Sequence, residues 1–199
     1  MLVMLFVGMV YAQEGGEGNK LGVPTDTKGV QCSFTEPFIS VRYNYQQNVL
    51  VEKKEDGVNI SKVTMKLVST NPFTPKYNVF LPNQKKPSLV MQWTNNGSDG
   101  MSDILYPLSA TWNGHHGACF FVDSFGTHVV SGTSADPEPW LNIRSEASTS
   151  AGVLGKLYDG TEVTVLETNK NWVKVRVVTG QLANTEGWVS SKFLQKITP

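Results

Sequence analysis

The chain has 199 residues, of which 40% are hydrophobic and 10% are aromatic, and its 17 basic residues equal its 17 acidic residues. A surface that binds nucleic acid or an anionic membrane shows an excess of clustered lysine and arginine, so this balance argues against both kinds of partner. The length is sufficient for two small domains with cores of their own.

The chain begins with an apolar run from Leu2 to Tyr11, which is too short to cross a bilayer as a helix. Ala12 then supplies a small residue where a signal peptidase would cut, and residues 1–12 are predicted to be a secretory signal peptide. A buried N-terminal strand is the alternative. Residues 13–29 are polar and rich in glycine, which predicts a flexible tether. We therefore expect a periplasmic or secreted protein with no membrane span.

Residues 30–125 alternate apolar and polar side chains in short runs that are separated by turn residues. This pattern predicts an antiparallel β domain. Ile39 and Val41 share a face of the first clear strand, and Leu108 and Ala110 share a face of the last one. No long helical period occurs, so we predict an all-β protein.

The two cysteines, Cys32 and Cys119, lie near the two ends of this domain. An even cysteine count in an exported chain predicts a disulfide between them. The alternative is a catalytic thiol at Cys119, because His115 and His116 lie close to it in the sequence. Catalytic partners usually come from distant parts of the chain, so the disulfide is the preferred interpretation.

The segment Ser98-Asp99-Gly100-Met101-Ser102-Asp103 contains oxygen ligands and a glycine, as calcium loops do, but lacks their spacing. We interpret it as a tight turn whose aspartates accept backbone hydrogen bonds. His115 and His116 would face opposite sides of a strand, and His128 has no set of zinc ligands around it. No metal and no other cofactor is expected.

Three fragments within residues 31–120 resemble a poorly characterised family of bacterial envelope proteins. They are Cys32-Ser33-Phe34-Thr35-Glu36-Pro37-Phe38, the Asp-Gly-Met-Ser-Asp loop at 99–103, and the late Cys119. The family usually has an aromatic residue after Glu-Pro-Phe, whereas this chain has Ile39. The resemblance implies fold and compartment, and it brings no established activity.

Residues 126–139 contain prolines and glycines without an apolar pattern, which predicts an interdomain linker. Five short strands are then predicted within residues 140–197, with Asp159-Gly160 as a hairpin turn and an alternating strand that includes Val173 and Val175. So many short strands in a small segment favour a closed barrel, because closure removes the exposed edges.

Several motifs of this segment resemble the bacterial SH3 (SH3b) family over roughly residues 140–195. In chain order they are Leu141-Asn142-Ile143-Arg144-Ser145, Gly155-Lys156-Leu157, Gly160-Thr161-Glu162-Val163, Trp172-Val173-Lys174-Val175 and Gly187-Trp188-Val189-Ser190-Ser191. The resemblance implies an SH3-like β-barrel that acts as a binding module, often for cell-wall peptides or envelope proteins, without catalytic residues. Leu157-Tyr158-Asp159 is similar to a motif of eukaryotic SH3 domains, but it stands before the middle hairpin, and we reject that relationship.

The candidate ligand contacts are Trp140, Tyr158, Trp172 and the stretch Thr179–Glu186, at one rim of the barrel. The alternative is that these aromatic residues fill the core. We prefer the core for Trp188, because a small barrel needs large side chains inside. For Trp172 both interpretations stay open.

The sequence favours an exported, non-enzymatic protein whose barrel recognises a peptidoglycan peptide or a segment of an envelope protein. One alternative is an inhibitor or scaffold that holds a partner protein through residues 30–125. Another is an uncharacterised cell-wall hydrolase with carboxylates from Glu36, Asp99 and Asp103. No phosphate loop and no Gly-x-Ser-x-Gly motif supports an enzyme. The oligomeric state is left open.

Overall fold

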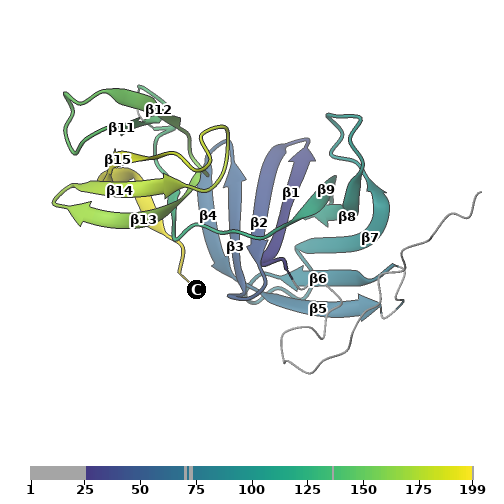
Figure 1. Ribbon diagram of the computed structural model, residues 1–199. Helices are drawn as coiled ribbons and strands as arrows, with labels where there is room; N and C mark the ends of the chain where they lie inside the picture. Colours follow the sequence, from purple (N-terminus) through teal and green to yellow (C-terminus); the bar gives the residue numbers. More distant parts are fainter. Residues whose placement is uncertain (1–25, 70, 72–73, 136, 199) are drawn as a thin grey trace, which may run out of the picture.

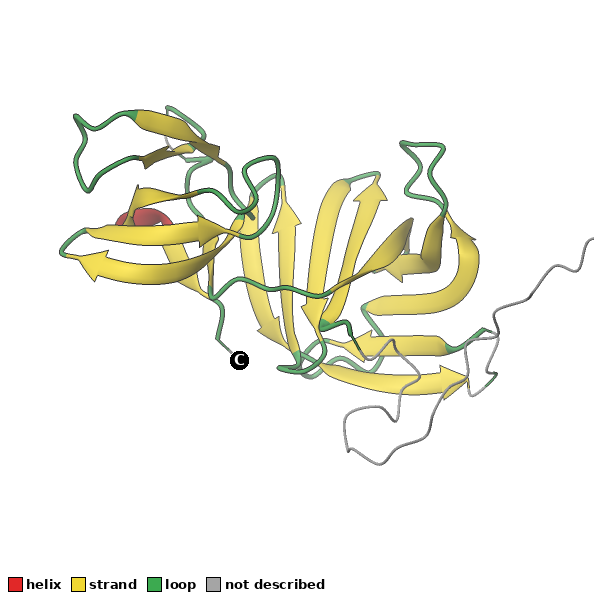
Figure 2. Ribbon diagram, viewed as in Figure 1, coloured by secondary structure: helices red, strands yellow, loops and turns green. Residues whose placement is uncertain are grey.

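The computed structural model describes residues 26–69, 71, 74–135 and 137–198 of the chain. The expected signal peptide, residues 1–12, and most of the expected tether, residues 13–29, lie outside this part. The described residues form two sheets and one short 3-10 turn, η1 (Ser191–Phe193), so the all-β prediction is confirmed (Figure 2). Within the same residues, no helix has the length and apolar character needed to span a membrane.

The first sheet has nine antiparallel strands in the spatial order β4-β3-β2-β1-β9-β8-β7-β6-β5 (Figure 1). The strands are β1 (Gly29–Thr35), β2 (Phe38–Asn44), β3 (Val49–Lys54), β4 (Gly57–Lys62), β5 (Thr64–Ser69), β6 (Lys76–Phe80), β7 (Leu89–Gly97), β8 (Tyr106–Trp112) and β9 (His115–Val122). Most neighbours in space are also neighbours in sequence, joined by short turns.

The two edge strands of this sheet, β4 and β5, are consecutive in the chain. Only Val63 stands between them; its side chain is buried, and its amide donates a hydrogen bond to the Asn48 carbonyl at 2.8 Å. Because the edges are joined in this way, the sheet curls, and β5 and β6 run across β1–β4 (Figure 1). The curled sheet, which we call the first barrel, encloses one apolar core. This core includes Phe34, Val41, Tyr43, Leu50, Tyr77, Leu89, Leu108 and Trp112.

The predicted disulfide joins Cys32 to Cys119. The two residues are opposite each other in the β1–β9 register, and both are fully buried. The bond therefore links two strands in the middle of the sheet that are 87 residues apart in the chain. With both cysteines bonded, neither is free to act as the catalytic thiol of the alternative interpretation.

The second sheet has seven strands in the order β12-β11-β15-β14-β13-β10-β16. They are β10 (His128–Val130), β11 (Leu141–Arg144), β12 (Val153–Leu157), β13 (Glu162–Asn169), β14 (Trp172–Val177), β15 (Glu186–Ser190) and β16 (Leu194–Lys196). The core of this barrel consists of aliphatic side chains: Val130, Leu141, Ile143, Leu157, Val163, Val173, Val175, Val177 and Val189.

Strand β10 lies inside residues 126–139, the segment expected to be a linker. His128 and Val129 pair with both β13 and β16, and Val129 and Val130 are fully buried. A strand of three residues among prolines and glycines leaves little periodicity to detect. The connection between the two sheets is therefore shorter than the predicted linker, and it consists of the residues between Val122 and His128.

The expected hairpin at Asp159-Gly160 is wrong, because β12 pairs with β11 alone and β13 pairs with β14 and β10. The turn instead connects two strands that are separated in the sheet. Strand β10 pairs with β13 where a hairpin partner would lie, and the Gly160 amide donates to the carbonyl of Val130, the last residue of β10, at 2.9 Å.

Candidate functional site

Trp140 and Trp172 line the same groove on the outside of the second barrel. The groove has a volume of about 270 Å³. Trp172 begins β14, Trp140 directly precedes β11, and Phe193 comes from η1. The complete lining is Pro137, Glu138, Trp140, Leu141, Asn142, Arg144, Thr149, Trp172, Ser190 and Phe193. Two of the three predicted aromatic contacts are thus close together, on elements that are distant in sequence.

The alternation of β14 explains why Trp172 faces outward. Val173, Val175 and Val177 are buried, so the residues between them lie on the opposite face of the strand. Trp172 is half-buried there and lies opposite Ser190 of β15. Of the two interpretations left open for Trp172, the structure selects the surface.

The preference for Trp188 as a core residue is wrong. Val189 is fully buried and Gly187 is buried, which places Trp188 on the outer face of β15. There it is half-buried, opposite Lys174 of β14 and Arg144 of β11. Aliphatic side chains already fill the interior, and a strand cannot turn one residue inward without reversing its neighbours.

Cations lie beside the aromatic side chains. The Lys156 ammonium is 3.5 Å from the centre of the Trp140 ring, a cation–π contact. Arg144 lines the groove, and its Nη1 donates to the Ala151 carbonyl at 2.8 Å, which holds the guanidinium in place. Glu138 contributes the carboxylate of the lining. The groove therefore combines flat apolar surface with a fixed guanidinium.

A salt bridge occupies the neighbouring part of this outer face. Arg176 donates to Glu186 from Nε at 3.0 Å and from Nη2 at 2.6 Å. These hydrogen bonds, together with the charges of Arg176 and Lys174, hold the pKa of Glu186 below its ordinary value. All three side chains are well exposed to solvent, so the pair contributes little to stability.

Tyr158, the third predicted contact, does not line the groove. It follows β12 with half of its surface exposed, and its amide donates to the Thr161 hydroxyl at 3.2 Å. No residue of the stretch Thr179–Glu186 lines the groove either. The Thr179 hydroxyl accepts a hydrogen bond from the Glu162 amide, and Thr179 and Gly180 line a pocket with residues of the first barrel. That these residues bind a ligand stays a prediction.

Sequence reasoning missed a buried contact between the two barrels. Arg42 of β2 donates from Nε to Glu162 of β13 at 2.8 Å, and Glu162 is fully buried. Arg42 also donates to the Gln31 side chain at 2.6 Å and to the Ser124 carbonyl at 2.7 Å. Its guanidinium lies 4.8 Å from the centre of the Phe125 ring. One arginine thus binds the first barrel, the connection and the second barrel.

Both carboxylate oxygens of Glu162 accept a hydrogen bond. One accepts from Arg42, and the other accepts from the Gly126 amide at 2.8 Å. Burial raises the pKa of Glu162, although the charge of Arg42 and these hydrogen bonds act in the opposite direction. Removal of either partner of such a buried ion pair leaves the other charge buried without compensation, so the pair favours the arrangement in which both groups meet. Two positions 120 residues apart leave no spacing signal that could reveal this pair in the sequence.

The tight-turn prediction for the Asp-Gly-Met-Ser-Asp loop is confirmed at Asp99. One carboxylate oxygen accepts from the Met101 and Ser102 amides at 3.0 Å each, and the other accepts from the Tyr106 hydroxyl at 2.9 Å. The two backbone hydrogen bonds lower the pKa of Asp99 most. This carboxylate is therefore occupied in holding the loop. Among the described residues, no group of three or more potential metal ligands gathers in one place.

The same loop contacts the Glu-Pro-Phe turn. Gly100 has a φ of +75°, and a Cβ at this position would lie 2.8 Å from the Thr35 hydroxyl. Thr35 is directly opposite Phe38 in the β1–β2 register. Two of the fragments that resemble the envelope-protein family are therefore adjacent in space.

One family comparison identifies the second barrel. Residues 141–195 match the family described as Bacterial SH3 domain, and the match runs from β11 to β16. This confirms the SH3b resemblance seen in the sequence. No curated protein sequence matches the chain. Strand β10 precedes the matched residues, and the resemblance assigned to residues 31–120 stays a prediction.

Proposed function

We propose that the bacterial SH3 domain at residues 141–195 recognises a peptide of the cell envelope, in an exported protein that has no enzymatic activity of its own. The groove between Trp140 and Trp172 is the proposed contact surface. The observation that carries the proposal is that three aromatic rings, those of Trp140, Trp172 and Phe193, line one groove together with the fixed guanidinium of Arg144. The core of the barrel behind this groove is aliphatic. The domain assignment supports a binding module, often one for cell-wall components.

The chemistry of the groove suits a peptidoglycan stem peptide. Such peptides carry carboxylates and small methyl side chains. Methyl groups can pack on the flat faces of Trp140 and Trp172, which are rigid and large. Only Nη1 of Arg144 is bonded within the described part of the chain, so its remaining N–H groups can donate to a carboxylate.

Export is part of the proposal. The disulfide between Cys32 and Cys119 is compatible with an oxidising compartment outside the cytoplasm. The expected signal peptide supports the same location from the sequence. Both observations support a location where peptidoglycan is accessible.

Sedimentation of the full chain with purified peptidoglycan tests the proposal. The Trp172→Ala variant should bind at least about ten-fold more weakly than the wild type, a loss of about 1.4 kcal/mol, because it removes one aromatic wall. Trp188→Ala is the matched control: it removes a half-buried outer tryptophan that does not line the groove, and binding should be retained. Equal binding by the wild type and a folded Trp172→Ala variant would contradict the proposed surface.

A further inference from the structure

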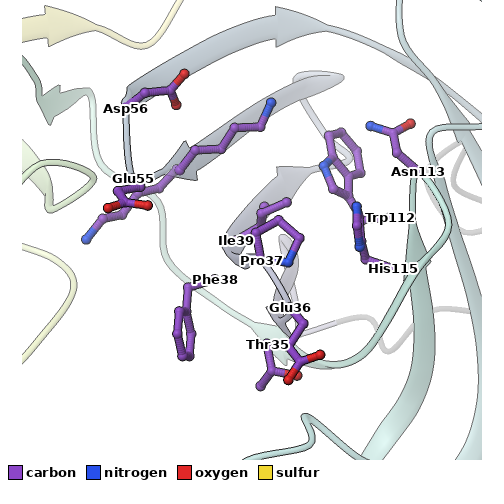
Figure 3. A pocket seen from close by; sticks show the side chains of 12 residues that line it. Thr35, Glu36, Pro37, Phe38, Ile39, Glu55, Asp56, Trp112, Asn113 and His115 are labelled. Atoms are coloured by element: carbon purple, nitrogen blue, oxygen red, sulfur yellow. The ribbon is translucent and has the colours of Figure 1, made fainter.

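A second and larger pocket lies at one end of the first barrel, between three hairpin turns (Figure 3). The turns are the β1–β2 turn with Glu36 and Pro37, the β3–β4 turn with Glu55 and Asp56, and the β8–β9 turn with Asn113. The volume of this pocket, which we call the mouth pocket, is about 1280 Å³. Nothing in the SH3 domain assignment involves it.

Apolar side chains form much of the inside of the mouth pocket. Pro37 and Ile39 lie between Phe38 on one side and Trp112 on the other (Figure 3). Trp112 is buried and fixed, because its indole N–H donates to Glu52 at 2.8 Å. Phe38, by contrast, is 72% exposed, the largest exposed fraction among the large hydrophobic residues of the described chain. A ligand in this pocket can therefore cover an aromatic ring that the fold itself leaves in water.

The charges around the mouth pocket are mainly negative. Glu36, Glu55 and Asp56 are exposed, and none of these carboxylates has an ion-pair partner in the described part of the chain. Of the two lysines in the lining, Lys54 is already neutralised, since its ammonium lies 3.0 Å from Glu52. Lys53 packs its methylene groups against Gly160 of the second barrel, and its ammonium has no ion-pair partner among the described residues. Three unpaired carboxylates thus outnumber one unpaired ammonium in the lining.

We infer that the mouth pocket binds a lysine or arginine side chain displayed by a partner protein. The aliphatic stem of such a side chain packs on the exposed Pro37, as amphipathic cationic side chains do on apolar surfaces. Its charged head lies near Glu55 and Asp56, and the exposed Phe38 ring can contact the cation. Negative charge without internal partners selects a cationic ligand over an anionic one. This inference goes beyond the peptide-binding function proposed for the SH3 domain and does not depend on it.

The test uses the full chain and three blocked five-residue peptides, Ala-Leu-X-Leu-Ala, in which X is lysine, norleucine or glutamate. Fluorescence anisotropy of labelled peptides measures the affinity. We expect the lysine peptide to bind at least about ten-fold more tightly than the norleucine peptide, because only lysine supplies the positive charge. The double variant Glu55→Gln, Asp56→Asn should lose at least about ten-fold in affinity for the lysine peptide, since it removes two carboxylates at an exposed turn.

The matched control is the double variant Glu146→Gln, Glu167→Gln, which removes the same charge from exposed positions of the second barrel. It should bind the lysine peptide as the wild type does, and so should Trp172→Ala, which separates this site from the SH3 groove. Equal losses in the two double variants would show general electrostatic attraction and overturn the inference. Preference for the glutamate peptide, or no binding of the lysine peptide, would overturn it as well.

Discussion

The groove of the bacterial SH3 domain and the mouth pocket of the first barrel differ in size, chemistry and charge. The groove has about 270 Å³, two tryptophan walls and a fixed arginine, whereas the pocket has about 1280 Å³, an apolar lining and unpaired carboxylates. The small barrel fills its interior with aliphatic side chains, so only its outer face can receive a ligand. The nine-stranded sheet curls around a larger core and leaves one end open. In this chain the surface of the small barrel lies on its outer face, and the surface of the larger barrel lies at its open end.

The contact between Arg42 and Glu162 holds these two surfaces in a fixed relation. Both side chains are buried, and the connection between Val122 and His128 contributes Ser124, Phe125 and Gly126 to the contact. The exposed pair Arg176–Glu186 has the same chemistry without the burial. The two pairs provide a matched test of how much the burial of an ion pair contributes to the free energy of unfolding.

The largest loss of stability is expected for Glu162→Ala, which removes the buried ion pair between the two barrels. This substitution leaves the Arg42 guanidinium buried without its carboxylate, and it should lower the free energy of unfolding by about 3–5 kcal/mol. Denaturant unfolding of the full chain measures the loss. Glu186→Ala, at the exposed pair, should lower the free energy of unfolding far less, because water and salt screen that pair. Similar costs for the two variants would show that the contact does not hold the barrels together.

A smaller loss of stability is expected for Asp159→Asn, which loosens one side of the groove. The Asp159 carboxylate accepts from the Thr133 amide at 2.9 Å, from the Thr133 hydroxyl at 2.7 Å and from the Ser134 amide at 3.3 Å. These bonds anchor the segment that leads to Trp140. An amide cannot accept on both sides, and the variant should lose about 1–3 kcal/mol in a thermal or denaturant unfolding experiment. Asp103→Asn, at an exposed loop position, should unfold as the wild type does.

The loss of stability caused by Asp159→Asn should also depend on pH. Burial raises the pKa of Asp159, but the hydrogen bonds from Thr133 and Ser134 outweigh it and hold the pKa below its ordinary value of 3.8. A carboxyl whose pKa is lower in the folded state stabilises the fold above its unfolded pKa, and this stabilisation is lost as the pH falls through the folded pKa. The difference in stability between the wild type and Asp159→Asn should therefore be full at neutral pH and shrink below the ordinary pKa. A difference that grows on acidification would contradict this role of Asp159.

Alternation and motif order made much of the fold predictable from the sequence. The inward face of β14 follows directly from its valines, and the two cysteines of the chain form the predicted disulfide. Size alone was a poor guide, since Trp188 was expected inside although the alternation of Val189 excludes it. The buried Arg42–Glu162 pair could not be predicted, because an isolated charge on a strand looks the same whether it faces water or another domain. Of the predicted ligand contacts, Trp140 and Trp172 line the same groove and Tyr158 does not, and their binding of a ligand stays a prediction.

The most direct test of the proposed function is an NMR titration of the full chain with a soluble peptidoglycan stem peptide. The chain has five tryptophans, and each indole N–H gives its own signal. We predict that the signals of Trp140 and Trp172 shift on titration, while that of Trp112, at the mouth pocket, stays in place. Unchanged signals from Trp140 and Trp172 at saturating peptide, or a shift confined to Trp112, would contradict the assignment of the SH3 groove as the peptide-binding surface.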